Sequence, residues 1–296
     1  MNWDLKGCGV ALVTPFDENG QINYDQLATL IDWHIKHKTD ALIIAGTTGE
    51  ASTIKGEEHK ELIRKSVEIA YGRIPIIAGT GSNETVWAIE LSKAAATAGA
   101  DGLLLVTPYY NKTNTKGLIK HYETIADVVN IPMILYNVPS RTGLNIPLEA
   151  MVHLSKNPKI VGVKDASGNL TYSSEIMRLC DKDFVMLSGN DDIIVPMMAI
   201  GATGVISVVG NILPEETHNI TACFLAGKVE EARALQLKYN GFIHSLFYET
   251  NPIPVKTAMN LLGMNVGDLR LPLYEMDAGQ KERMIDEMKK IGLIEK

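Results

Sequence analysis

Short apolar runs alternate along the chain with longer amphipathic stretches, and this alternation constrains the fold more than any other feature. The runs are rich in Val, Ile and Leu and lack a polar face, which is typical of parallel strands buried on both sides. They recur roughly every 25–35 residues, the spacing of βα units. The predicted strands are 9–13, 41–44, 75–78, 103–106, 133–136, 160–164, 184–187 and 205–207. Eight such units predict a closed (β/α)8 TIM barrel, with an open doubly wound sheet as the alternative.

The amphipathic stretches predict the helices between these strands. Apolar residues three and four positions apart predict a helix over 24–37, and similar spacing predicts one over 57–71. Asn83 is the predicted N-cap of the next helix, which ends where Gly99 supplies a C′ residue. The other predicted helices are 116–129, a short one from Pro147, 171–180 and 191–200.

The chain continues well past the eighth predicted strand. Periodicity predicts helices over 214–226, 229–248, 252–262 and 278–291. One of them is enough to complete a barrel, and no Pro/Gly/Ser-rich linker separates the rest. We therefore predict that residues 1–225 form the barrel and that residues 226–296 form a helical extension packed on it.

Composition limits the classes of partner. Of 296 residues, 46% are hydrophobic and 21% are charged, as in ordinary globular proteins. The net charge is −7 and there is no basic run, which argues against nucleic acid and anionic membranes. No apolar stretch reaches the ~18 residues that span a bilayer. With three widely spaced cysteines and no apolar leader, the chain is expected to be cytoplasmic, with reduced thiols.

The sixth apolar run ends on a lysine. Lys164 and Asp165 follow four residues that are apolar or glycine. A buried ammonium is costly, so a core strand seldom ends this way. From the strand alone, Lys164 is expected to extend its head group to water or to pair with Asp165. A lysine held in an apolar pocket can instead lose its proton and attack a carbonyl carbon.

Polar clusters suited to the same chemistry follow other predicted strands. Gly46 to Glu50 follows the second strand, where glycines let the backbone approach a ligand and the hydroxyls of Thr47 and Thr48 add hydrogen bonds. A plain turn with threonine caps is the alternative for this segment.

Three more strands end in such clusters. Tyr109 and Tyr110 follow the fourth strand, and Ser188 and Gly189 follow the seventh. Arg141 follows the fifth strand, and its guanidinium suits a substrate carboxylate, although a surface ion pair is the alternative. Because the strand ends of a barrel share one rim, this convergence is more specific than any single cluster.

Metal and nucleotide sites have weak support. No His-Glu-x-x-His pattern and no paired carboxylates follow the predicted strands. The histidines, His59 among them, fall in predicted helices away from the strand ends. Gly79 to Asn83 follows a strand and opens a helix but lacks the third glycine of a dinucleotide fingerprint. We therefore predict no metal and no cofactor.

These motifs resemble the dihydrodipicolinate synthase and N-acetylneuraminate lyase family of lysine-dependent aldolases. Three segments carry the resemblance: Gly46 to Glu50, Tyr136 to Gly143, and Gly162 to Asp165. The resemblance covers essentially the whole chain and implies a (β/α)8 barrel with extra C-terminal helices, usually a homotetramer. Pro139 to Gly143 is similar to the dihydrodipicolinate synthase branch, because sialic acid lyases typically lack this arginine.

The resemblance also implies roles for individual residues. Lys164 is expected to form a Schiff base with pyruvate. The resemblance implies a proton relay of Tyr136, Thr47 and Tyr110, with Tyr110 reaching in from a neighbouring subunit. It implies that Thr47 and Thr48 bind the pyruvate carboxylate and that Arg141 binds the carboxylate of the semialdehyde. Gly189 and Ile206 are expected to line the pocket.

The implied reaction is the condensation of pyruvate with L-aspartate 4-semialdehyde in lysine biosynthesis. Two alternatives remain: another pyruvate-dependent aldolase acting on a sugar acid, and a non-catalytic binder on a barrel scaffold. In many family members free lysine inhibits by binding between subunits, and Asn83, Tyr109 and His59 match that site. Gly56 and Trp87 replace a histidine and a glutamate that lysine-sensitive members often carry. We expect weak or absent lysine feedback.

Overall fold

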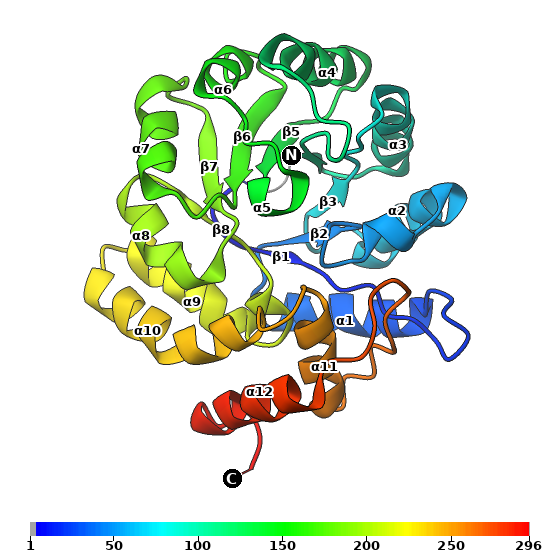
Figure 1. Cartoon of the computed structure of the whole chain (residues 1–296), viewed down its shortest axis with the longest axis vertical. Coiled ribbons are helices and arrows are strands. Elements are labelled where there is room, and N and C mark those ends of the chain that lie inside the picture. Colours follow the sequence, from blue (N-terminus) through cyan, green and yellow to red (C-terminus); the bar gives the residue numbers. More distant parts are fainter. Residues whose placement is uncertain (1–3, 296) are drawn as a thin grey trace.

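Eight parallel strands close into a barrel within residues 4–295, the part of the chain that the computed structural model describes (Figure 1). Each strand pairs with the next along the chain, and β8 pairs back with β1. The strands are β1 (Gly7–Ala11), β2 (Ala41–Ile44), β3 (Ile76–Gly79), β4 (Gly102–Val106), β5 (Met133–Asn137), β6 (Ile160–Asp165), β7 (Val185–Ser188) and β8 (Gly204–Ser207). The predicted (β/α)8 barrel is confirmed, and the open sheet is excluded.

Helices surround the barrel close to the predicted positions. They are α1 (Tyr24–Lys36), α2 (Gly56–Ala70), α3 (Thr85–Ala98), α4 (Thr115–Val128), α5 (Pro139–Thr142), α6 (Leu148–Leu154), α7 (Leu170–Leu179), α8 (Ile194–Ala199) and α9 (Pro214–Leu225). Short 3₁₀ turns are η1 (Ala51–Thr53), η2 (Asp191–Ile193) and η3 (Val209–Asn211). The sequence did not predict α5, which carries Arg141. Among the described helices, none is long and apolar enough to cross a membrane.

The predicted N-cap of α3 is wrong by one residue. The side chain of Glu84 accepts hydrogen bonds from the backbone N–H groups of Val86 and Trp87. Asn83 instead uses its carbonyl oxygen to accept a hydrogen bond from Asn111. A carboxylate suits this position because its charge interacts favourably with the positive end of the helix dipole.

The strands bury both of their faces in different cores. Along β2, Ala41 and Ile43 belong to an apolar cluster inside the barrel, whereas Leu42 and Ile44 belong to the larger core between the barrel and its helices. This alternation follows from the two-residue period of a strand. It explains why the sequence shows continuous apolar runs, since neither face meets water.

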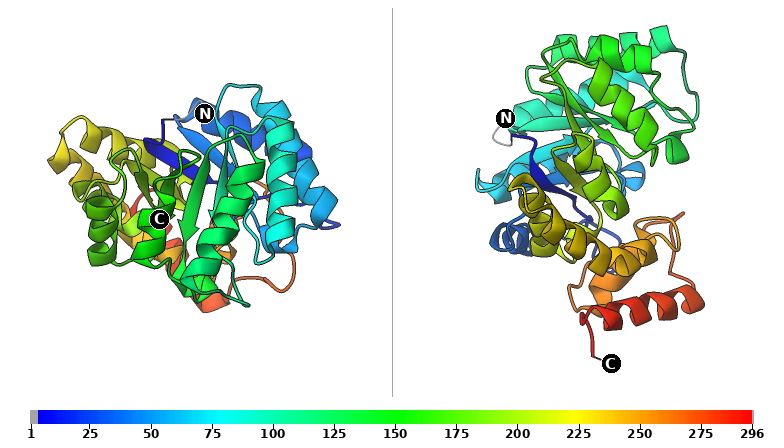
Figure 2. Two further views of the ribbon diagram at one scale, coloured as in Figure 1. Left: turned by 90° about the horizontal axis from the view of Figure 1, so that it is seen from above. Right: turned by 90° about the vertical axis from the view of Figure 1, so that its left-hand side faces the viewer.

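The last part of the chain is helical. It contains α10 (Val229–Ser245), α11 (Ile253–Leu261) and α12 (Ala278–Lys290). Helix α10 packs along α9, and α12 packs on α10 and α11. Figures 1 and 2 show α12 at the outer edge of the molecule, with α11 between it and the barrel. The division of the chain at residue 225 stays a prediction.

Candidate active site

A register shift in β6 turns Lys164 toward the barrel interior. Met133 of β5 pairs with Ile160, but the next residue, Ile134, pairs with Gly162, so β6 carries one extra residue. A shift of one residue exchanges the two faces of a strand. Beyond the shift, Lys164 pairs with Tyr136, which belongs to the inner cluster.

Lys164 is a buried lysine beside an aromatic ring. Its side chain is 4% exposed, and Nζ lies 4.5 Å from the centroid of the Tyr136 ring. It has no ion-pair partner among residues 4–295. The interpretation that Lys164 extends to water or pairs with Asp165 is therefore wrong.

Asp165 is occupied by other donors. Its carboxylate accepts hydrogen bonds from the side chains of Asn137 (3.0 Å), Ser167 (3.0 Å) and Ser173 (2.6 Å). Since Lys164 and Asp165 are adjacent along a strand, their side chains point to opposite faces. Asp165 thus fixes the outer side of the strand end and leaves the amine of Lys164 to the inside.

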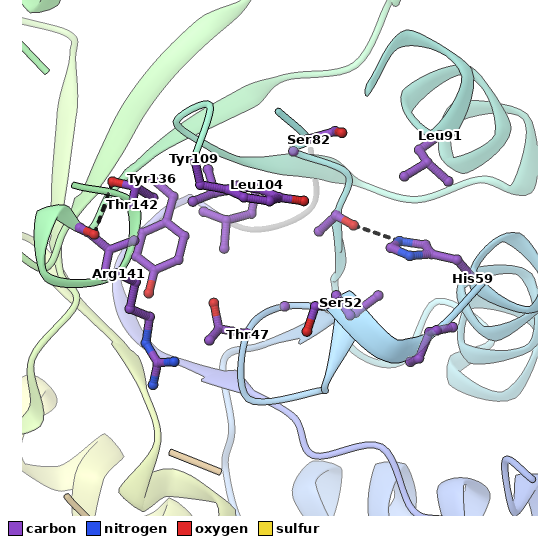
Figure 3. A pocket seen from close by; sticks show the side chains of 18 of the residues that line it. Thr47, Ser52, His59, Ser82, Leu91, Leu104, Tyr109, Tyr136, Arg141 and Thr142 are labelled. Carbon is purple, nitrogen blue, oxygen red and sulfur yellow. Dashed lines mark hydrogen bonds between the residues drawn. The ribbon is translucent and has the colours of Figure 1, made fainter. Parts of the chain in front are cut away.

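A cavity of about 450 Å³ opens beside these strand ends. Thr47, Tyr136 and Arg141 line one end of it, and Figure 3 shows their polar groups gathered there. They come from the loop after β2, from β5 and from α5. Tyr136 lines the cavity and also contacts Lys164, so its ring connects the cavity wall to the buried lysine.

Five of the eight predicted site residues, Lys164 among them, do not line this cavity. Thr48 is buried behind it, and Tyr110 is 92% exposed on the surface, with a positive φ of 67°. Gly189 and Ile206 lie at the ends of β7 and β8, where Ile206 packs in the inner cluster with Tyr136. The structure therefore brings Thr47, Tyr136 and Arg141 together in the cavity, places Lys164 against the Tyr136 ring, and leaves Tyr110 apart from them.

Gly189 holds two strand ends together. Its N–H donates to the carbonyl of Asp165 at 2.7 Å. A Cβ at this position would lie 2.5 Å from the Cβ of Ala166, so a side chain has no room. The glycine is needed for this close approach next to Lys164.

Asn251 connects two of the predicted substrate-binding residues, and the sequence analysis missed it. Its Nδ2 donates to Thr48 Oγ1 at 3.0 Å, and its carbonyl oxygen accepts from Arg141 Nη2 at 2.9 Å. Its own Oδ1 is buried without a partner. The only signal in the sequence is an Asn-Pro pair just before the predicted helix over 252–262.

The other end of the cavity contains a histidine that we predicted to lie away from the strand ends, which is wrong. His59 lines the cavity, and its Nε2 donates to the carbonyl of Gly79, the last residue of β3, at 2.8 Å (Figure 3). Burial lowers the pKa of His59, and the hydrogen bond to Gly79 opposes that shift. A neutral ring with its proton on Nε2 fits this contact.

Trp87 and Gly56 fit together at this same end. A Cβ on Gly56 would lie 3.0 Å from the Trp87 ring, so the indole occupies the space of a larger residue at position 56. Lys60 Nζ lies 5.5 Å from the centroid of this ring. The two departures from the lysine-sensitive pattern are thus one packing arrangement.

Asp191 is another buried charged group near the strand ends. Its Oδ2 accepts from the backbone N–H groups of Val208 (2.8 Å) and Val209 (2.9 Å). Burial raises the pKa of this carboxyl, while its hydrogen bonds and the positive charge of Lys164 oppose the rise.

No group of three or more His, Cys, Asp or Glu side chains within residues 4–295 is arranged to hold a metal ion.

Comparison with known proteins identifies the family. A family model described as the dihydrodipicolinate synthetase family matches residues 4–291. The chain belongs to this family. The resemblance that the three motifs carry is therefore confirmed.

Relatives in the dihydrodipicolinate synthetase family cover nearly the whole chain. A 4-hydroxy-tetrahydrodipicolinate synthase from Thermoanaerobacter sp. (strain X514) is 54% identical over 291 residues, which are 98% of both chains. The crystal structure of dihydrodipicolinate synthase from Aquifex aeolicus is 44% identical, with a TM-score of 0.95, and the match covers 97% of this chain and 98% of that one.

A third relative is known as a complex with pyruvate. It is the chloride-inhibited dihydrodipicolinate synthase from Acinetobacter baumannii complexed with pyruvate, which is 41% identical with a TM-score of 0.95 over 98% of this chain and all of the other. All three relatives are named as synthases, which supports the synthase prediction over the sialic acid lyase alternative.

Proposed function

We propose that this chain condenses pyruvate with L-aspartate 4-semialdehyde to 4-hydroxy-tetrahydrodipicolinate, through a Schiff base on Lys164. The observation that carries the proposal is that Lys164 is buried, has no ion-pair partner within residues 4–295, and packs on Tyr136, which lines the cavity. Membership of the dihydrodipicolinate synthetase family supports the choice of substrates.

The first step is the capture of pyruvate. The neutral amine of Lys164 attacks the ketone carbon, and uptake of one proton with loss of one water gives a protonated imine. The neutral form of the amine is the nucleophile in this step. The imine withdraws electrons from the methyl group, and loss of one methyl proton gives an enamine.

The second step forms the carbon–carbon bond. The enamine carbon attacks the aldehyde carbon of the semialdehyde, whose oxygen takes up a proton. The amino group of the semialdehyde then attacks the imine carbon, which closes the ring and frees Lys164. One water is released per turnover, at imine formation. These steps need proton transfer but call for no metal or organic cofactor.

Tyr136 and Thr47 are the proposed proton carriers. Both line the same end of the cavity, and neither adds a charge to a buried site. Thr47 and Thr48 are proposed to bind the pyruvate carboxylate, and Arg141 the carboxylate of the semialdehyde, because a guanidinium offers two parallel N–H donors. Gly189 and Ile206 are proposed to shape the pocket around Lys164.

Tyr110 is proposed to act in the site of a neighbouring subunit. Its 92% exposed side chain and its position on the β4–α4 connection support this role, since it contacts nothing in its own cavity. The proposal goes with a homotetramer, which the family resemblance implies. A cytoplasmic location goes with the three free cysteines, Cys8, Cys180 and Cys223.

Borohydride trapping tests the proposed function. The protein is incubated with pyruvate, reduced with sodium borohydride and examined by peptide mass spectrometry. We expect one reduced adduct on Lys164, together with consumption of semialdehyde in a coupled assay. A protein that binds pyruvate but yields no adduct would be a binder rather than an aldolase. An adduct without semialdehyde turnover would favour a different acceptor aldehyde.

A further inference from the structure

A buried ion pair joins the Gly46–Glu50 loop to the C-terminal helices. Glu50 Oε1 lies 3.0 Å from Lys256 Nζ, and both side chains are at most 1% exposed. Nζ also donates to the carbonyl oxygens of Thr14 (3.2 Å) and Asp268 (2.6 Å). The second carboxylate oxygen of Glu50 accepts from the N–H of Arg270 at 2.9 Å. The three ammonium donors and both carboxylate oxygens are therefore all used.

The same loop is held at two more positions. Thr48 accepts a hydrogen bond from Asn251, and Thr14 Oγ1 donates to the carbonyl of Gly49 at 2.7 Å. A Cβ on Gly49 would lie 3.0 Å from the carbonyl oxygen of Leu12, so the loop sits tightly against the chain after β1. The side chain of Thr47 alone is left facing the cavity.

The backbone at Glu50 supports a role in shaping the loop. Its φ is 56°, in the left-handed region that a residue with a Cβ seldom occupies. Such a conformation persists where surrounding contacts over-determine it, often beside a functional site. Here the backbone of Glu50 is hydrogen-bonded to Thr47 and Thr53, and its carboxylate adds the contacts to Lys256 and Arg270. The side chain therefore helps to fix the direction in which the chain leaves Thr47 and Thr48.

A contribution to stability does not by itself account for the pair. Removing two charges from water is costly, and apolar residues of similar volume commonly stabilise a fold as well or better. What the ion pair offers, and an apolar pair does not, is defined geometry at both carboxylate oxygens.

We propose that Glu50 and Lys256 are positioning residues that set the Thr47–Thr48 segment for the carboxylate of pyruvate. The inference deepens the proposed function and rests on it. The pair touches no substrate and acts through the loop. Its effect therefore falls mainly on pyruvate, because Arg141, the proposed partner of the semialdehyde, lies on α5 and is joined to Thr48 through Asn251.

Four variants test this role: Glu50→Asp, Glu50→Gln, Lys256→Met and the double variant Glu50→Gln/Lys256→Met. The measurements are the half-saturation of borohydride trapping by pyruvate, the KM for semialdehyde at saturating pyruvate, and the thermal midpoint. Because displacement of a binding group by about 1 Å costs on the order of 100-fold, we expect the half-saturation for pyruvate to rise about 10- to 100-fold in the single variants. The KM for semialdehyde should change less than about threefold.

The double variant separates positioning from stability. It leaves no unpaired buried charge, so its thermal midpoint should recover most of what Lys256→Met loses. We expect its half-saturation for pyruvate to stay raised. If pyruvate binding recovers together with the thermal midpoint, the pair is structural and the inference is wrong.

Glu50→Asp keeps the charge and shortens the side chain, so it answers the question even if the other single variants do not fold. We expect a near-normal thermal midpoint and weakened pyruvate trapping, and normal trapping would contradict the inference. Lys159→Met is the matched control. Lys159 directly precedes β6, far along the chain from the loop, and its ammonium donates to the carbonyls of Ala126 and Val129. It should lower stability and leave pyruvate trapping unchanged. Absence of an adduct in the unaltered protein would instead refute the proposed function.

Discussion

Two buried lysines next to aromatic rings have opposite surroundings. Lys164 Nζ lies 4.5 Å from the ring centroid of Tyr136, and Lys256 Nζ lies 4.4 Å from that of Phe16. Lys256 has a carboxylate and two carbonyl oxygens as partners, whereas Lys164 has no ion-pair partner within residues 4–295. Burial alone therefore does not make a lysine a nucleophile.

The two lysines differ in the charged groups that surround their ammonium groups. Burial lowers the pKa of Lys256, but the charge and hydrogen bond of Glu50 oppose this, so deprotonation would abandon an ion pair. Lys164 has no ion-pair partner within residues 4–295, and the buried Asp191 carboxylate, which it faces, is held by the N–H groups of Val208 and Val209. We therefore propose Lys164, which has no ion-pair partner, for chemistry, and Lys256, whose three donors are all used, for holding structure.

The largest expected effect is the loss of condensation activity when Lys164 is replaced. Lys164→Met should lower the condensation rate by at least about 10⁴-fold, because the proposed nucleophile is lost. It should also abolish the trapped pyruvate adduct, as mass spectrometry would show. Lys256→Met should still form the adduct at high pyruvate concentration. Loss of the adduct in both variants would mean that the two lysines do not have separate roles.

Replacing Lys256 should lower the free energy of unfolding more than replacing Lys164, the reverse of the expected order for activity. Lys256→Met leaves the Glu50 carboxylate buried and unpaired, which costs about 3–5 kcal/mol of unfolding free energy. Lys164→Met should change that free energy by less than about 1 kcal/mol, since no partner is stranded. Urea denaturation followed by circular dichroism measures both. Equal destabilisation would show that Lys164 has a structural partner after all.

Arg141 contacts both the cavity beside Lys164 and the segment that leads into the helix of Lys256. It lines the cavity and also donates to the carbonyl of Asn251, which leads into α11. Arg141→Ala should raise the KM for semialdehyde about 100-fold, the value of a charged hydrogen-bonded contact, while pyruvate trapping on Lys164 persists. Steady-state kinetics with each substrate varied would check this. A larger loss on the pyruvate side would assign Arg141 to holding the Gly46–Glu50 loop.

The smallest expected effect concerns the far end of the cavity, where Trp87 packs on Gly56. That end has no carboxylate at position 87 to pair with an amine, so millimolar L-lysine should inhibit less than about twofold. Initial rates with and without L-lysine decide the matter. Strong inhibition would show that another carboxylate serves the amine. Trp87→Glu with Gly56→His would then test whether the two positions set sensitivity.

The position of Lys164 shows how far local patterns reach. The apolar run before it correctly predicts β6, and the motif correctly predicts the family. Counting alternate residues from Ile160 would nevertheless place Lys164 on the outer face. The extra residue that lets Gly162 pair with Ile134 reverses this, and no spacing within the run reveals it.

Contacts from distant segments were also beyond prediction. The pairing of Glu50 with Lys256 joins residues 206 positions apart, and Asn251 meets Thr48 across 203. His59 follows a helical pattern, yet its ring reaches the carbonyl of Gly79. Local patterns predicted the helices of His59 and Lys256 and the loop of Glu50, but the partner of each residue depends on how the elements pack.

The sequence by itself determined the barrel, the approximate helix bounds and the group of chemical residues at the strand ends. These follow from short-range rules: the period of a strand, the period of a helix and the residues suited to turns. The tertiary structure alone decided which buried lysine has a partner, because hydrogen bonds and ion pairs depend on distances between side chains that only packing brings together.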